Sequence, residues 1–125
     1  MDISERIFEL KMKDYCCSQM IMAMGLEDLE KEENPDLIAA MAGLCNGYWL
    51  EKTCGTLTGA ICLLYLADPE EAAQSLRDEL VDWFYENFES LECSELVGDN
   101  PLNKVEVCPV IIEKTYEKVQ ELLDI

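Results

Sequence analysis

The chain has 125 residues, half of them hydrophobic, and a formal net charge of −18. This length fits a single domain over residues 1–125, and the charge argues against binding to nucleic acid or to anionic membrane surfaces. There is no histidine, which excludes Ser-His and Cys-His nucleophile pairs, imidazole zinc sites and histidine-ligated haem. The acidic surface would suit a basic partner protein.

The number of cysteines bears on the compartment. Seven cysteines are present, and an odd number argues against the disulfide framework of a secreted protein. The first residues are acidic, so we expect no signal peptide. No apolar run approaches the ~20 residues of a membrane span. We therefore expect a cytoplasmic protein that keeps its cysteines reduced or bound to metal.

Three helices are expected in the first part of the chain. Residues 3–12 carry apolar residues on one helical face, as an amphipathic helix does. Residues 14–24 are apolar on all sides toward their end, which predicts a buried helix that starts at the capping residue Asp14 and stops at Gly25. A third helix should begin at Asn34-Pro35 and end near the turn signal Asn46-Gly47.

The second part of the chain predicts further helices. Thr53 is the expected N-cap of an apolar helix. Asp68-Pro69 should start a long amphipathic helix, residues 93–98 a short one, and Cys108-Pro109 the last. No convincing strand is found. The sequence therefore predicts an all-α fold, a compact bundle of about five to six helices with short connections.

The stretch Thr53–Ala60 carries the most specific chemistry. Cys54 is expected at a helix start, where free N–H groups and the helix dipole favour a thiolate. Gly55 and Gly59 share one helical face, so a backbone or a cofactor could approach Cys54 closely and contact both glycines. The alternative is that the glycines only permit tight helix packing and that Cys54 is a small buried hydrophobic residue.

Four cysteines are each expected at the start of a helix. Helix starts stabilise negative charge by typically ~0.3–1 kcal/mol each, which suits an iron–sulfur cluster or reactive redox thiols. Cys16 and Cys17 are adjacent and would point in different directions, so only one should join the site. Cys45 and Cys62 lie in apolar stretches and are expected in the core. The spacings match neither a C-x-x-C motif nor a zinc finger. The candidate sulfur ligands are therefore Cys54, Cys93 and Cys108, together with either Cys16 or Cys17.

The same cysteines carry a family resemblance that runs from about Ile7 to the end of the chain. The chain resembles the C_GCAxxG_C_C proteins, a family named for its cysteine pattern. Cys17, rather than Cys16, matches the first family cysteine because glutamine follows two residues later. The chain departs from the pattern at Thr53 and Thr56, where the family often has smaller residues, and in its extra Cys45 and Cys62. The matching segments are Cys17-Ser18-Gln19, Ala42–Gly47, Cys54–Ala60, Cys93–Gly98 and Cys108.

The resemblance implies a small helical protein with a redox role. The chain is also similar to the non-haem part of split-Soret cytochromes, in which an iron–sulfur centre is associated with this kind of domain. Haem function is not implied, because the chain lacks a haem-attachment motif. Cys45 lies close enough in sequence to Cys54 to be a substitute ligand.

Three hypotheses follow. The first is a redox or electron-transfer protein that works with a redox partner protein, and whose four candidate cysteines bind an iron–sulfur cluster or cycle between dithiol and disulfide without metal. The second is a structural zinc or protein-interaction module with four thiolate ligands. The third is a helical domain with inert buried cysteines, which could form a homodimer through the Met-rich helix at residues 16–24. The sequence indicates no substrate, so we assign no enzymatic activity.

Overall fold

The computed structural model describes residues 2–100 and 102–125, so Met1 and Pro101 lie outside the described residues. The all-α prediction is confirmed, and the only β-type pairing in the described chain is an isolated bridge between Thr53 and Glu92. No helix in these two ranges is both long enough and apolar enough to cross a membrane. In chain order the elements are α1 (Ile3–Met12), α2 (Cys17–Asp28), α3 (Pro35–Met41), η1 (Ala42–Leu44), η2 (Gly47–Glu51), α4 (Gly55–Ala67), α5 (Pro69–Glu71), η3 (Ala72–Leu76), α6 (Arg77–Phe88), α7 (Cys93–Val97) and α8 (Asn103–Leu123).

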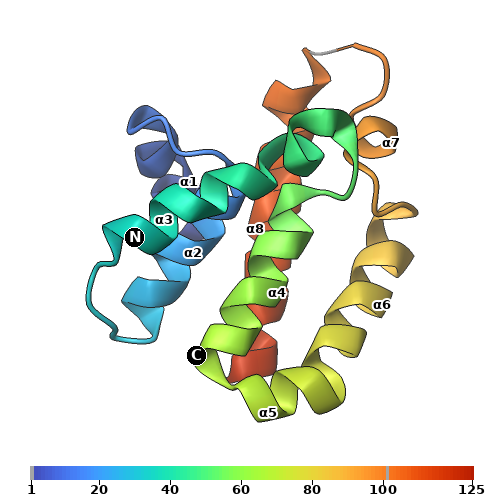
Figure 1. The fold of residues 1–125 in the computed structure, drawn as a ribbon. Coiled ribbons are helices and arrows are strands. Elements are labelled where there is room, and N and C mark those ends of the chain that lie inside the picture. Colours follow the sequence, from blue (N-terminus) through green and yellow to red (C-terminus); the bar gives the residue numbers. More distant parts are fainter. Residues whose placement is uncertain (1, 101) are drawn as a thin grey trace.

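Helix α4 lies at the centre of the bundle. It packs against α2 on one side and against α8 and α6 on the others (Figure 1). Leu63 and Leu64 of α4 are fully buried, as are Phe84 of α6 and Tyr116 of α8. The apolar side chains of helices that are distant in sequence therefore meet around α4, and the hydrophobic effect holds them there.

Local capping signals predict several helix starts correctly. The Asn34 side chain accepts a hydrogen bond from the Leu37 N–H (3.1 Å), and Asp68 accepts one from the Glu71 N–H (3.2 Å). Each cap is followed by proline at the first helical position, where no N–H donor is needed. From Pro69 the chain continues through α5, η3 and α6 with right-handed helical backbone at both junctions.

The predicted limits of α2 are wrong at both ends. Cys16, not Asp14, is the N-cap, because Asp14 has a φ of 64° and belongs to the turn that follows α1. The helix passes through Gly25 and ends at Asp28. A Cβ on Gly25 would overlap the Leu63 side chain of α4, so this glycine provides room for helix packing rather than a stop.

Two further predicted starts are also wrong. Cys54, not Thr53, caps α4, because Thr53 is engaged in the bridge to Glu92. Helix α8 begins at Asn103, more than a turn before the predicted start, so Cys108 and Pro109 lie inside it. Pro109 has no N–H to donate to the carbonyl of Val105, one helical turn earlier. Val105 is exposed, so water can reach this carbonyl instead.

Between η1 and α4, residues 46–51 have a left-handed backbone at every position except Leu50. Asn46, Gly47, Tyr48 and Trp49 all have φ between 51° and 63°, a conformation that costs roughly 1–2 kcal/mol for each residue that is not glycine. Trp49 Nε1 donates to the Ala42 carbonyl (2.8 Å), and Lys104 Nζ donates to Asn46 Oδ1 (2.9 Å). These bonds hold the segment beside the start of α8, at one end of the bundle (Figure 1), and the Asn46-Gly47 turn is confirmed.

Candidate functional site

The fold brings the four candidate cysteines together from four separate segments. Cys17 opens α2, Cys54 caps α4, Cys93 opens α7, and Cys108 lies in the first turns of α8. All four are free thiols. In each of the six pairs among them, the charge of one thiolate would raise the pKa of another thiol. We call Cys17, Cys54, Cys93 and Cys108 the four-thiol site.

Two backbone hydrogen bonds place Cys54 beside Cys93. The Cys54 N–H donates to the Leu91 carbonyl (2.7 Å), and the Cys93 N–H donates to the Lys52 carbonyl (2.6 Å). These two hydrogen bonds lie on either side of the isolated bridge between Thr53 and Glu92. The start of α7 is thereby fixed against the start of α4, and this pairing could not be inferred from local sequence.

Donors surround two of the sulfurs. The buried Thr56 hydroxyl acts on both Cys17 and Cys54 and lowers the pKa of each. Main-chain N–H groups act in the same direction, from Asn46 on Cys17 and from Leu57 on Cys54. These donors would stabilise a negative sulfur, whether a thiolate or a metal ligand. Sequence reasoning missed the role of Thr56, although its departure from the family pattern was a signal.

Burial nevertheless outweighs the donors. It is the largest influence on all four thiols and raises the pKa of each, to about 11 for Cys108. The prediction that helix starts would favour thiolates is therefore wrong in its net direction. The reason is that removing a charged sulfur from water costs more than the amides at a helix start return. The four sulfurs hold protons at neutral pH, and binding of a metal would release them.

Lys104 is a second residue that sequence reasoning missed. Its charge lowers the pKa of Cys93 and of Cys108, whereas Glu51 and Glu92 raise the pKa of Cys93. Lys104 and Cys108 are four residues apart in α8, a spacing that puts two residues on one helical face. The spacing was visible in the sequence, but the helix was predicted to start only at Cys108.

The donor set has the right chemistry for a sulfur-bound metal. Four thiolates without histidine suit an iron–sulfur cluster or a tetrahedral zinc ion. Among residues 2–100 and 102–125, however, no three Cys, Asp or Glu side chains are placed to hold one ion. The sulfurs are near one another but do not converge on a single point, so metal binding stays a prediction.

The remaining cysteines differ from expectation. Cys16 and Cys45 form a disulfide with a Cα–Cα distance of 6.1 Å, so the prediction that every cysteine is reduced or metal-bound is wrong for this pair. Cys45 is fully buried as predicted, and Cys17, not Cys16, is the free thiol of the adjacent pair. Cys62 is exposed instead of lying in the core, because α4 turns one side toward solvent despite its apolar sequence.

The two glycines of α4 lie against protein. A Cβ on Gly55 would lie 2.5 Å from the Leu44 carbonyl oxygen and 2.9 Å from Cys17 Sγ, and one on Gly59 would lie 2.9 Å from Ser18 Cβ. Both glycines therefore allow α2 and η1 to approach α4, which is the packing role that the sequence offered as an alternative. Contact of Gly55 and Gly59 with a cofactor stays a prediction.

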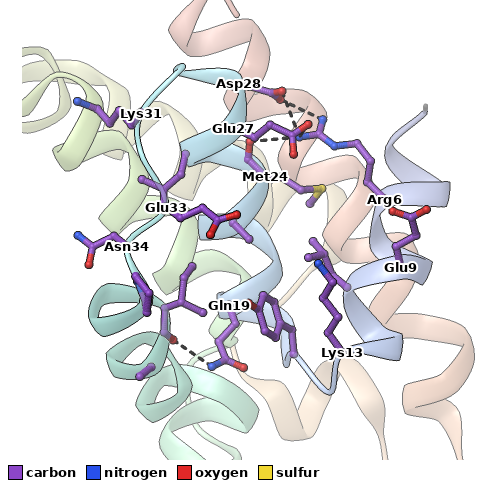
Figure 2. A pocket seen from close by; sticks show the side chains of 17 residues that line it. Arg6, Glu9, Lys13, Gln19, Met24, Glu27, Asp28, Lys31, Glu33 and Asn34 are labelled. Carbon is purple, nitrogen blue, oxygen red and sulfur yellow. Dashed lines mark hydrogen bonds and ion pairs between the residues drawn. The ribbon is translucent and has the colours of Figure 1, made fainter.

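A groove of about 930 Å³ lies elsewhere, between α1, α2 and α3 (Figure 2). Arg6 enters it and pairs with Asp28 at 3.1 Å. Lys13, Glu9 and Glu33 also line it, so both charge signs are present. No cysteine lines this groove, and its mixed charge selects no class of ligand.

Comparison with known protein families gives a match over most of the chain. A model of the family described as "Putative redox-active protein (C_GCAxxG_C_C)" matches residues 15–122. This confirms the resemblance drawn from the cysteine-containing segments, and the matched range includes all seven cysteines. No curated protein and no solved structure was found to match the chain.

Proposed function

Because the chain belongs to the C_GCAxxG_C_C family, we propose that it is a redox protein whose working atoms are the sulfurs of the four-thiol site. The observation that carries this proposal is that in every pair of the four thiols the charge of one would raise the pKa of the other. Four segments that are distant in sequence supply these thiols, and the packed bundle gathers them.

Two chemistries are open to these sulfurs. With iron and sulfide they would act as cluster ligands, and a bound cluster would supply one-electron transfer. Thr56 and the main-chain N–H groups would then stabilise the negative sulfurs of Cys17 and Cys54. Without metal, two thiols would oxidise to a disulfide and release two electrons and two protons. The nearby Cys16–Cys45 disulfide favours the cycle between dithiol and disulfide in the structure described here. To bind a cluster, the four sulfurs would have to move closer together.

The partner we propose is a redox protein with a basic surface, in a cytoplasmic setting. Glu51 and Glu92 lie close enough to Cys93 to raise its pKa, and both are solvent-facing or partly so. Complementary charges would steer a basic partner toward the Cys93 end of the site and increase the association rate.

The test is anaerobic purification followed by measurement of iron, acid-labile sulfide and visible absorption, with thiol titration of the metal-free protein. We expect either a cluster that is lost in Cys54→Ser and Cys93→Ser, or a reversible dithiol couple within the four-thiol site. Cys62→Ser is the matched control and should change neither. A colourless, iron-free protein in which no pair of these thiols oxidises reversibly would end the proposal.

A structural zinc site is the second candidate, favoured by the all-sulfur donor set. It predicts one zinc ion per chain, no redox activity, and unfolding when a chelator removes the metal. In that case the acidic surface would serve protein interaction rather than electron transfer. Metal analysis of the same anaerobic preparation separates the two candidates.

A further inference from the structure

The Cys16–Cys45 disulfide lies next to the four-thiol site. A Cβ built on Gly55 would lie 2.9 Å from Cys17 Sγ and 3.0 Å from Cys45 Cα. Because both distances start from the same point, Cys17 Sγ and Cys45 Cα cannot be farther apart than their sum. A free thiol of the site thus lies close to the residue that carries one sulfur of the disulfide.

The surroundings of Cys45 suit a thiol better than a disulfide sulfur. Ser18 Oγ donates its single hydrogen to the Met41 carbonyl (2.5 Å) and also lies 2.9 Å from Cys45 Sγ. In the disulfide state Cys45 has no hydrogen, so nothing bridges the oxygen and the sulfur. In the reduced state the Cys45 S–H can donate to Ser18 Oγ. This added hydrogen bond, in a fully buried place, favours reduction.

The two halves of the disulfide differ in access. Cys16 is partly exposed, whereas Cys45 is fully buried. An outside dithiol can therefore approach only the Cys16 sulfur, and an inside thiol can approach Cys45. Cys17 is itself partly exposed, but its Sγ lies beside Gly55, as Cys45 does, so Cys17 is the free thiol placed to reach the buried half of the disulfide.

We propose that the Cys16–Cys45 disulfide is a redox switch for the four-thiol site, reduced by an outside dithiol and able to exchange with Cys17. The consequence for the site rests on the proposed function, but the exchange does not. Once exchange has moved the disulfide to Cys17–Cys45, Cys17 can neither ligate metal nor pair with the other three thiols, so the exchange closes the site and reduction opens it again.

Both steps balance. In the exchange, Cys17 gives its proton to water and its sulfur attacks Cys45 Sγ. The Cys17–Cys45 bond forms as the Cys16–Cys45 bond breaks, and Cys16 leaves as a thiolate that takes up a proton. In the reduction, a thiolate of the outside dithiol attacks Cys16 and Cys45 leaves. The second thiol of the dithiol then frees Cys16, so two electrons and two protons pass to the protein and the dithiol becomes a disulfide.

The first test uses disulfide mapping by mass spectrometry on the iron-free full chain. After mild oxidation with diamide, Cys16→Ser should contain a Cys17–Cys45 disulfide, while Cys62→Ser keeps the Cys16–Cys45 bond. Cys45 left as a thiol in Cys16→Ser, or paired with a cysteine other than Cys17, would overturn the exchange. If Cys16→Ser does not fold, the oxidised wild type is held at pH 9.5 instead. Cys16 should then become accessible to alkylation and Cys17 should cease to be accessible. The absence of this change would also overturn the exchange.

The second test titrates the disulfide with dithiothreitol. Ser18→Ala should lower the equilibrium constant for reduction by roughly two- to fivefold, because the thiol loses its acceptor. Thr115→Val is the matched control. It removes a buried hydroxyl of α8 that makes no hydrogen bond, so it should leave the equilibrium constant unchanged. An unchanged or higher constant in Ser18→Ala would contradict the role of Ser18. Neither test needs a cluster or activity of the other thiols, so failure of the proposed function would be seen separately.

Discussion

Gly59 of α4 lies directly against Ser18 of α2, so that a Cβ on Gly59 would come within 2.9 Å of Ser18 Cβ and 3.0 Å of Ser18 Cα. This is contact of a helix with the backbone of its neighbour. It aligns the starts of the two helices, where Cys17 and Cys54 lie. The position of the four-thiol site thus depends on how closely α2 approaches α4.

Replacement of this glycine should therefore be costly. Gly59→Ala should lower the free energy of unfolding by about 1–3 kcal/mol, because α2 must move away from α4. Urea unfolding measures the change. Gly43→Ala is the matched control, since a Cβ there meets nothing within 4 Å, and it should be neutral or slightly stabilising. Equal losses in both variants would contradict close packing at Gly59.

A polar network ties α1, α2 and α8 together around Asp28. Arg6 Nη1 and Nη2 each donate to Asp28 at 3.1 Å (Figure 2), and the Tyr116 hydroxyl donates to it at 2.5 Å. Burial raises the pKa of Asp28, but the hydrogen bonds and the charge of Arg6 outweigh it, so the pKa lies below its ordinary value. The ionised carboxylate is therefore stabilised in the folded state.

The sign of the resulting pH dependence follows. The stability from Asp28 is present above the unfolded pKa and is lost as pH falls through the lower folded pKa. Asp28→Asn should cost about 1–3 kcal/mol at pH 7, and its unfolding free energy should fall less than that of wild type on acidification. Glu9→Gln, an exposed carboxyl on α1, is the control. A parallel acid profile for Asp28→Asn and wild type would argue against the network.

The four thiols predict an opposite dependence at alkaline pH. Burial raises the pKa of Cys108 to about 11, so the folded state holds this proton more tightly than the unfolded chain does. Its stabilising contribution is complete below the unfolded pKa and is lost as pH rises toward the folded one. The unfolding free energy of wild type minus that of Cys108→Ser should fall over this window, by less than about 1.4 kcal/mol per pH unit. A difference that is flat or rises would show that Cys108 is not buried as described.

Thr56 provides a prediction about thiol reactivity. Its hydroxyl lowers the pKa of both Cys17 and Cys54, so Thr56→Val should raise both values further. Alkylation of these two thiols by iodoacetamide at a fixed pH should slow by roughly two- to tenfold. Thr56→Ser retains the hydroxyl and should restore the rate, and the rate at Cys62 should not change. Faster alkylation in Thr56→Val would indicate that the side chain acts only by shielding.

Features set by neighbouring residues could be predicted from the sequence. The starts at Asn34-Pro35 and Asp68-Pro69 depend on a side chain that bonds an N–H three residues later, and the local sequence is enough to specify that. Cys108-Pro109 has a related signature, yet α8 begins earlier. There the Asn103 side chain donates to the Val97 carbonyl (2.9 Å) and Lys104 bonds to Asn46, and these longer-range contacts hold the extra turn in place.

The candidate site divides in the same way. Cys17, Cys54 and Cys93 could be placed near helix starts from local signals, although the predicted caps Asp14 and Thr53 each lie before the observed cap. The net rise of their pKa could not be predicted, since burial depends on the packing of α2, α4, α7 and α8. The Cys16–Cys45 disulfide was missed for the same reason, as it joins residues 29 apart in sequence that no spacing rule connects.

The most direct measurement is disulfide mapping of reduced, metal-free Cys62→Ser protein after graded oxidation with diamide. If the four sulfurs form one redox site, new disulfides should join Cys17, Cys54, Cys93 and Cys108 to one another within a single chain and should reverse with dithiothreitol. If these four stay thiols, or pair only between chains, while Cys16–Cys45 forms normally, they do not form one site.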